Sequence, residues 1–442
     1  MQLLLYIIIL LHFCSTVSYG QITNPQAPQY EKFKPIQLNG NQPIHKPTSK
    51  NQYQNRPQLG LTAEDVIRQQ NIETQRLMME PGSKNREDRQ KESLKIVQAL
   101  LEEEKEEQNK QNARKQATKA IESLYVQSAQ SICSMLWRKE KVSLKKAVWL
   151  AESAYLRGQN SYEKYNAQID EVILFCEKYA KEQQLDWTKH DHRVKVLVDY
   201  FTKTIRLRSG EMHKRIMYDF QDPYGRQSYK QLMVSKLLET NKGQCHSMPL
   251  LFKILAEEID IRAYICLSPA HSYIKIFFED GRQPVFETTN GSLTGDNWIA
   301  LSNVVPFTAL RSGIYLDTLS EKETLIHCLN HLALSYEAEF GYKRFVYEVA
   351  EVAIEETPKY PPAWALFSNY VTYTTMEALK ELNYPKLEEL ENYPVLKGRL
   401  ELMYQIYADM DRMGYKNLEE TEYVNWLKNN QEAIKKYQLE DY

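Results

Sequence analysis

The segment from residue 243 to residue 290 constrains the fold of this chain more than any other part of the sequence. It opens with an apolar run at helical spacing, and Pro249 stands in its first turn, where a helix needs no N–H group. Three short runs rich in β-branched and aromatic residues follow, at 263–267, 273–278 and 285–289. Such runs predict strands, and Asp280-Gly281 predicts a hairpin between the last two. A helix followed by antiparallel strands predicts an α+β domain.

Helical patterns precede this segment. Residues 90–127 are rich in Glu, Lys, Gln and Ala and have few apolar positions, which predicts a long and mostly exposed helix. Structure is expected to begin near Thr62, a plausible N-cap with acidic residues in the following turn. From residue 121 to residue 205, apolar side chains recur at helical spacing. This pattern predicts several packed helices without a site of their own.

Helical patterns also follow it, after about residue 320. Leu332, Tyr336, Ala350 and Ala353 approximate the spacing of a tetratricopeptide repeat, and Trp364 falls where the next unit would place a large residue. Two degenerate units are fewer than a repeat array needs for stability. We therefore predict tetratricopeptide-like helical hairpins rather than a regular array.

The N-terminus has the features of an export signal. Its first twenty residues are an apolar run that is too short and too quickly polar for a membrane span, although it carries no Lys or Arg. Ser18 and Gly20 supply small residues before a cleavage point after Gly20, whereas Cys14 lacks the small residue that precedes a lipidated Cys. We predict an exported protein, periplasmic, envelope-associated or secreted, with an uncleaved anchor as the alternative and no later transmembrane span.

The residues that follow the apolar run are rich in Gln, Asn, Pro and Lys and contain too few apolar side chains to bury a core. They are expected to form a disordered linker. The whole sequence thus divides into a signal peptide (1–20), a linker (21–60), a helical region (61–184), an α+β domain (185–318) and a repeat-like helical region (319–442).

Charge and aromatic content exclude one class of partner. The formal net charge is −2, so nothing in the balance indicates binding to nucleic acid or to an anionic membrane surface. The 30 tyrosines are scattered at core-like spacing and form no base-stacking stripe beside basic residues. The expected partner is a polypeptide substrate or another protein, and no nucleic acid.

The cysteines suggest a single functional thiol. Five of the six lie beyond the apolar N-terminal run, and an odd number leaves at least one unpaired within the chain. No dense disulfide framework or Cys-x-x-Cys metal motif is present. Apolar runs surround four of them, which are expected to be buried: Cys133, Cys176, Cys266 and Cys328. The remaining cysteine, Cys245, opens the amphipathic helix described above.

Cys245 stands first in an ordered set of three chemical groups. At a helix N-terminus the dipole and the unpaired N–H groups favour a thiolate and can hold an oxyanion. His271 begins the second predicted strand and Glu287 lies in the third, so a hairpin brings these two positions together within a residue or two of register. The imidazole can then take the thiol proton while the carboxylate fixes its tautomer. The pattern predicts a Cys-His-Glu triad.

The run NKGQCHSMPLLFKILAEEIDIRAYICLSPAHSYIKI, ending in VFETTNG, resembles bacterial members of the transglutaminase-like superfamily. That superfamily has a cysteine-protease-like, papain-like fold with a helix-borne Cys, a strand-borne His and an acid on the next strand. Gly-Gln-Cys also matches the nucleophile motif of animal transglutaminases, although His246 replaces the usual Trp and Glu287 the usual Asp. The resemblance covers residues 185–300. It implies Cys245 as nucleophile, His271 as base and Glu287 as orienting acid, with no metal or organic cofactor.

Several supporting roles and alternatives remain open. Gln244 and Thr288 are candidates for oxyanion or supporting contacts, and Asp296 is an alternative orienting acid. His190-Asp191-His192 has adjacent side chains that point apart on a helix, and the pair His327 and His331 lacks the Glu of a zincin motif, so neither is expected to hold a metal.

Two functions are consistent with the sequence. The first is thiol-dependent acyl transfer or hydrolysis on amide bonds, of a peptide or a glutamine side chain, through a thioester intermediate. The second is a non-catalytic scaffold that keeps the transglutaminase-like fold and binds a protein partner with its repeat-like helices.

Overall fold

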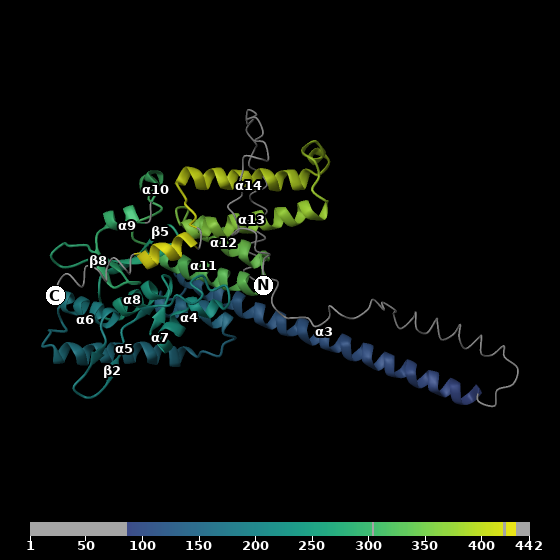
Figure 1. Cartoon of the computed structure of the whole chain (residues 1–442), viewed down its shortest axis with the longest axis horizontal. Coiled ribbons are helices and arrows are strands. Elements are labelled where there is room, and N and C mark those ends of the chain that lie inside the picture. The colour runs from purple at the N-terminus through teal and green to yellow at the C-terminus, as the bar shows by residue number, and fades with distance from the viewer. Residues whose placement is uncertain (1–85, 303–304, 419–420, 430–442) are drawn as a thin grey trace. The chain divides into compact units, whose positions relative to one another are not determined.

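The computed structural model describes residues 86–302, 305–418 and 421–429 and shows a mixed helical and β fold in which helices predominate (Figure 1). This agrees with the α+β prediction at the level of secondary structure. The predicted signal peptide, the predicted linker and the helix start expected at Thr62 lie outside the described residues. The described chain forms two compact units, divided between Ser123 and Leu124, and each is described by itself.

The first described element is the helix α3 (Arg86–Leu136), which has 51 residues. Its residues 101–117 are exposed, as the polar sequence predicts, and they belong to the first unit. The end of the same helix belongs to the second unit, where Tyr125, Ile132 and Met135 are fully buried. The change from a polar to an apolar pattern near residue 121 therefore marks where α3 begins to contribute to a core.

Three helices follow in the second unit: α4 (Leu144–Tyr155), α5 (Tyr162–Glu182) and α6 (His190–Thr202). The side chains of Ser143 and Ser161 cap α4 and α5 by accepting hydrogen bonds from the N–H groups of Lys146 and Lys164. Their apolar faces are buried, as the helical periodicity predicts. The packed helices expected between residues 121 and 205 are thus present.

A four-stranded antiparallel sheet follows, in the order β5-β6-β7-β8. Its strands are β5 (Ala263–Ser268), β6 (His271–Ile276), β7 (Val285–Glu287) and β8 (Ser292–Thr294). The first three agree with the predicted strands within two residues. Residues 288–291 form the turn from β7 to β8, and Ser292 pairs with Glu287 to start an edge strand that the sequence patterns did not predict. Three residues are too few to show strand alternation in a sequence.

Two small strand pairs lie before this sheet. The strands β1 (Ile205–Arg206) and β2 (Met212–His213) pair antiparallel, whereas β3 (Met217–Tyr218) pairs parallel with β4 (Lys242–Gly243). A 3₁₀ turn (Tyr229–Leu232) and the helix α7 (Val234–Thr240) connect β3 to β4. The β3–β4 pair holds the chain directly before the helix α8 (Ser247–Glu258), which begins just after Cys245.

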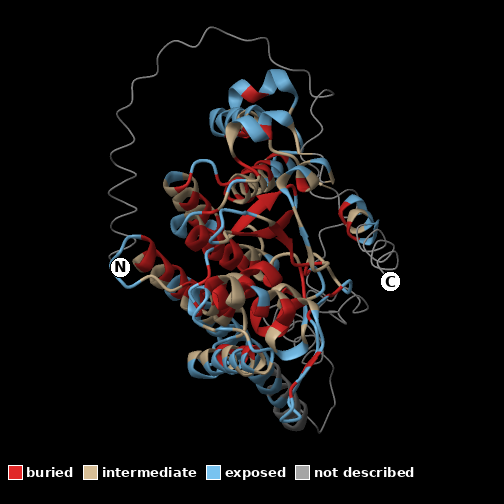
Figure 2. Ribbon diagram, turned by 90° about the vertical axis from the view of Figure 1, so that its left-hand side faces the viewer, coloured by how far each residue is buried: buried red, intermediate tan, exposed pale blue. Residues whose placement is uncertain are grey.

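The core of the second unit lies between α8 and the sheet. Every residue of β6 and β7 is buried, and Figure 2 shows buried residues concentrated on the strands and on the helices around them. Phe252 of α8 lies 5.2 Å from Phe286 of β7, measured between ring centroids, and 5.2 Å from Phe201 of α6. Burial of each such ring is worth about 1.5–3 kcal/mol. These rings hold the middle of α8 against the strands that carry His271 and Glu287.

The rest of the chain is helical. It comprises α9 (Asp296–Ser302), α10 (Phe307–Ser312), α11 (Glu321–Phe340), α12 (Arg344–Glu356), α13 (Pro361–Glu381), a 3₁₀ helix (Leu387–Asn392), α14 (Pro394–Met413) and residues 421–429. Consecutive helices from α11 to α14 pack on one another, and α11 also packs on α4. In the described part of the chain, every helix is too short or too polar to cross a membrane.

The chain returns to the sheet after α14. The hydroxyl of Ser312 donates a hydrogen bond to the carbonyl of Met413 at 2.7 Å. Residues 421–429 then form a short helix, the yellow segment beside the strands in Figure 1, in which Tyr423 and Leu427 are buried. Because Tyr423 contacts His271, the first residue of β6, the last described segment packs beside the β5–β6 turn.

Candidate active site

Cys245 lies in the tight turn that opens α8. Gly243, two residues earlier, allows this turn by its small size, because an added Cβ would lie 2.7 Å from Cγ of Met248 and 3.0 Å from Oγ of Ser247. The carbonyl of Gln244 accepts the N–H of Met248 at 3.0 Å, so the turn leads directly into the helix. The placement of Cys245 at a helix N-terminus agrees with the sequence prediction.

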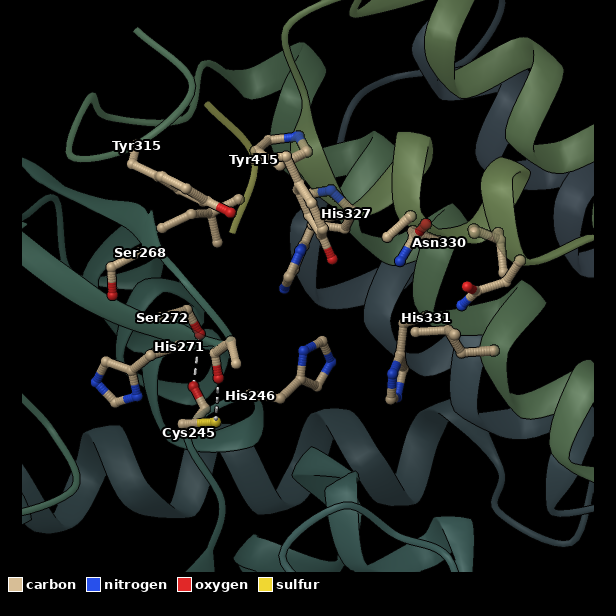
Figure 3. Close-up of a pocket in the computed structure, with 18 residues that line it drawn as sticks. Cys245, His246, Ser268, His271, Ser272, Tyr315, His327, Asn330, His331 and Tyr415 are labelled. Carbon is tan, nitrogen blue, oxygen red and sulfur yellow. Dashed lines mark hydrogen bonds between the residues drawn. The ribbon is translucent and has the colours of Figure 1, made fainter. Parts of the chain in front are cut away.

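The turn between β5 and β6 faces this cysteine. Its thiol points to the carbonyl of Ala270, with Sγ 4.0 Å from the oxygen, and the hydroxyl of Ser272 donates to the carbonyl of Cys245 at 2.5 Å (Figure 3). Ala270 has φ of +54°, a left-handed conformation that costs an alanine about 1–2 kcal/mol. In this strained conformation the carbonyl group of Ala270 and the start of β6 face the thiol.

His271 and Glu287 form a buried pair. Nε2 of the imidazole lies 2.7 Å from Oε2 of the carboxylate, and both side chains have no exposed surface. Pairing of β6 with β7, through Ile274 opposite Phe286, brings the two positions together as the predicted hairpin requires. The other carboxylate oxygen, Oε1, accepts hydrogen bonds from Thr289, from its N–H at 3.1 Å and from its hydroxyl at 2.8 Å.

The supporting residues differ from those expected. The hydroxyl of Thr288 is buried and has no hydrogen-bond partner, and the support expected from it comes from Thr289 instead. Asp296 pairs with Lys275 at 2.8 Å rather than with His271, so the alternative orienting acid is excluded. Gln244 is buried, and its side-chain amide donates to the carbonyl of Gln221 at 3.4 Å, outside the cavity described below.

Electrostatics in this pair favour a charged imidazole. Burial by itself lowers the pKa of His271, but the carboxylate of Glu287 and the hydrogen bond with it raise the pKa, and the nearby thiol of Cys245 adds to the increase. The net effect raises the pKa of His271 from 6.5 to about 10. The site therefore contains an imidazolium–carboxylate pair beside a thiol at neutral pH.

The segment 421–429 covers the other nitrogen of the same imidazole. The hydroxyl of Tyr423 lies 3.2 Å from Nδ1 of His271, and the ring of Trp426 packs edge-on at 4.7 Å between centroids. Tyr423 is only 1% exposed. These contacts link positions about 150 residues apart, and the helical pattern at the C-terminus contains no sign of them.

A cavity of about 270 Å³ opens next to Cys245. The turns that carry Cys245 and Ala270 form one side, and α11 and α13 form the other (Figure 3). Leu267, Leu334 and Leu366 contribute apolar wall, whereas a group of polar side chains faces the cavity from the turn before α8 and from α11: His246, His327, Asn330 and His331.

The three histidines, His246, His327 and His331, are close-packed and uncharged. The ring of His246 lies 4.1 Å from that of His331 and 4.7 Å from that of His327, measured between centroids. Burial lowers the pKa of His327 to about 4, and burial together with His327 lowers the pKa of His331 to about 3. Across the described chain, no group of three or more His, Cys, Asp or Glu side chains is arranged to hold a metal ion. The two α11 histidines are buried and line the cavity. The sequence analysis missed this position, for which their i, i+4 spacing was the available signal.

The other polar candidates have structural roles. Nε2 of His190 accepts the N–H of Arg262 at 3.1 Å, and Nδ1 of His192 accepts the N–H of Asp186 at 2.9 Å. The four other described cysteines are free and buried, as predicted, and Cys266 packs inside the sheet without reaching the cavity. Cys245 is the partly exposed cysteine among those described.

Known proteins provide no relative with which this site can be compared. No protein-family model, curated protein or solved structure matches the chain.

Proposed function

We propose that this chain is a thiol-dependent enzyme that cleaves or transfers the acyl group of an amide, with a transglutaminase-like, cysteine-protease-like core. Cys245 is the nucleophile, His271 the base and Glu287 the orienting acid in this proposal. The observation that carries it is the buried His271–Glu287 pair beside a partly exposed thiol at the start of a helix. A surface histidine or a core cysteine has no use for such an arrangement.

The proposed reaction has two halves. The thiolate of Cys245 attacks the amide carbon, and N–H groups of the turn before α8 hold the resulting oxyanion. The intermediate collapses with cleavage of the C–N bond, His271 gives its proton to the leaving amine, and a thioester remains. Water or a second amine then attacks the thioester, His271 takes its proton, and the thiolate leaves. Hydrolysis and amine transfer share every step up to the thioester.

Burial explains the role proposed for Glu287. Because the carboxylate is fully buried and bonded to Nε2, it fixes the orientation of the ring and leaves Nδ1 on the side of Tyr423. Thr289 holds the carboxylate in turn. Glu287 stands where the superfamily usually has Asp, and its extra methylene is accommodated at a distance of 2.7 Å from the imidazole.

The substrate proposed is a polypeptide, and the protein is proposed to be exported. The cavity beside Cys245 is walled by α11 and α13, so the repeat-like helical region would select the group presented to the thiol. The apolar first twenty residues support export to the periplasm, the envelope or the medium. No cofactor takes part in the proposed chemistry.

One observation favours a second candidate, a scaffold without turnover. Tyr423 and Trp426 cover His271, and the hydroxyl of Tyr423 lies within hydrogen-bond distance of the nitrogen that would serve the thiol. A protein that keeps the fold only to bind a partner has no need of an open site. The scaffold would use the same helical region for its partner.

Thiol reactivity distinguishes the two. Iodoacetamide at pH 6 is expected to alkylate Cys245 of the folded wild type rapidly, and His271→Ala slowly, because the imidazolium stabilises the thiolate. The labelled peptide is identified by mass, and the buried Cys133, Cys176, Cys266 and Cys328 serve as internal controls that stay unlabelled. Equal rates for the folded wild type and His271→Ala would refute the enzymatic proposal. An acyl adduct on Cys245 after incubation with peptides would support it directly.

A further inference from the structure

The cavity beside Cys245 contains a group of buried polar atoms without partners. Nε2 of His246, Nε2 of His327, Nε2 of His331 and Oδ1 of Asn330 have no hydrogen-bond partner in the structure. His327, Asn330 and His331 are 7%, 5% and 3% exposed, and all four side chains line the same cavity. An unsatisfied buried polar atom is costly, and most proteins keep few of them. Four in one cavity next to a nucleophile indicate a binding site.

The hydrogen bonds at Nδ1 of His331 and His327 determine whether Nε2 of each ring is a donor or an acceptor. The hydroxyl of Tyr229 donates to the carbonyl of His331 at 3.0 Å and lies 2.7 Å from Nδ1 of the same residue. Because the hydroxyl has a single hydrogen, Nδ1 donates its own to the hydroxyl oxygen. Nε2 of His331 is then left with a lone pair and is an acceptor.

His327 has the opposite tautomer. Its Nδ1 lies 2.5 Å from the hydroxyl of Tyr360, whose only hydrogen-bond partner in the described structure is this nitrogen. The phenol is the stronger acid and donates, so the ring hydrogen is on Nε2. His327 and His331 are one helical turn apart on α11. Together they offer one donor and one acceptor beside the cavity, and Asn330 lies between them in sequence.

The charge around the cavity is small. None of the described residues that line it is Asp, Glu, Lys or Arg, and the charge of His271 is balanced by Glu287. Burial, with His331 and His327 nearby, also holds the pKa of His246 well below its ordinary value, so this ring is neutral. A carboxylate bound here would place one of its oxygens opposite the acceptor nitrogen of His331. It would also lack an unpaired positive charge in the cavity wall with which to form an ion pair.

We propose that the α11 face of the cavity is a subsite that binds an uncharged carboxamide of the substrate and rejects the corresponding carboxylate. The amide NH₂ donates to Nε2 of His331, and the amide oxygen accepts from Nε2 of His327, with Asn330 beside them. This inference rests on the proposed function of Cys245 and names residues outside the segment that carries the triad. His327, Asn330 and His331 are specificity-determining residues in it.

Two alkylating reagents of nearly equal size test the subsite. Iodoacetamide carries a carboxamide and iodoacetate a carboxylate, and in both the thiolate displaces iodide and forms a C–S bond. The ratio of their second-order rates is measured at Cys245 of the full chain at pH 7 and compared with the same ratio for 2-mercaptoethanol. We expect the ratio at Cys245 to favour iodoacetamide by about ten-fold or more beyond that of the free thiol.

Variants separate α11 from the rest of the site. Asn330→Leu and His327→Phe are expected to reduce the preference for iodoacetamide at least about three-fold, whereas His192→Phe, the same substitution outside the cavity, leaves it unchanged. Asn330→Asp keeps the shape of the side chain and should strengthen the rejection of iodoacetate by adding a negative charge. Circular dichroism shows whether each variant is folded. If a variant does not fold, the ratio of the iodoacetamide and iodoacetate rates for the wild type still tests the subsite.

The possible outcomes separate this inference from the proposed function. Rapid alkylation of Cys245 by both reagents, with the ratio of 2-mercaptoethanol, would overturn the subsite and leave the nucleophile intact. Slow alkylation by both reagents would contradict the proposed function itself. A preference for iodoacetamide that survives in both Asn330→Leu and His327→Phe would also overturn the subsite, because the selectivity would then come from the His271–Glu287 pair.

Discussion

Two opposing effects act on the charge of His271. Burial disfavours its charged form, and the neighbouring carboxylate of Glu287 favours it, so that the pKa rises to about 10. The pair is tolerated in the core only while both partners and their hydrogen bonds are present, because a single buried charge destabilises the folded state. Thr289 donates hydrogen bonds to Oε1, the carboxylate oxygen that does not contact His271.

The raised pKa of His271 makes stability depend on pH. Its folded value of about 10 lies above its unfolded value of 6.5, so its contribution is fully present below pH 6.5 and is lost as the pH rises towards 10. Urea denaturation of the wild type and Glu287→Gln between pH 6 and pH 10 should show a difference of about 3–5 kcal/mol at pH 6 that narrows towards pH 10. Asp280→Asn, at an exposed ion pair, is the control. Parallel curves would show that the pair is not charged.

Thr288 and Thr289 provide a matched test of the support for Glu287. Thr289→Val removes the hydroxyl that donates to Oε1 at 2.8 Å, and we expect a loss of about 1.5–3 kcal/mol in the free energy of unfolding. Thr288→Val removes a buried hydroxyl that has no partner, so it should be neutral or slightly stabilising. Denaturant titrations of both variants give the comparison. Equal effects would mean that the hydroxyl of Thr289 does not hold the carboxylate.

At the scale of elements, short segments decide where the functional groups lie. The parallel pair β3–β4 and the small residue Gly243 hold the turn that presents Cys245, and the β5–β6 turn presents Ala270 and His271 to it. A helical segment from the end of the described chain, residues 421–429, then packs on the imidazole. The elements nearest the thiol are thus among the shortest in the fold.

The segment 421–429 is expected to restrain the thiol. Tyr423→Phe keeps the ring and its packing but removes the hydroxyl 3.2 Å from Nδ1 of His271. With Nδ1 released, the imidazole can interact with the thiol alone, and alkylation of Cys245 by iodoacetamide should become several-fold faster. Tyr393→Phe, at a partly exposed tyrosine before α14, is the control. A slower rate would show that the hydroxyl positions the imidazole, and an unchanged rate would show that it does not restrain the thiol.

The helix α7 depends on a side chain of α4. The buried carboxyl of Glu152 accepts the N–H groups of Val234 at 2.6 Å and Ser235 at 3.0 Å. Glu152→Ala leaves both groups without a partner, and we expect a loss of about 2–5 kcal/mol in the free energy of unfolding. Ser153→Ala, on the next residue of α4, is the control. Calorimetry or urea titration measures both, and a loss below about 1 kcal/mol would show that another group replaces the cap.

At the scale of the whole second unit, the candidate site is assembled from distant parts of the sequence. The proposed nucleophile and the His–Glu pair come from the α+β segment, the polar cavity wall comes from α11, and the cover over His271 comes from residues 421–429. The helical region is therefore not an appendage to the proposed enzyme. Because α11 also packs on α4, the position of this cavity wall depends on the N-terminal helices of the unit.

Local order along the chain was enough to predict the helix that follows Cys245, the strands that bear His271 and Glu287, and the burial of the other cysteines. Periodicity and a two-strand hairpin involve neighbours in the sequence, so their physics can be read from a short window. The roles of Thr289, Tyr423 and the α11 histidines depended on tertiary structure. The roles of Tyr423 and the α11 histidines require contact between segments that are distant in the sequence. The role of Thr289 requires that its side chain, and not that of Thr288, points to Glu287. Only the packing of the complete chain determines these features.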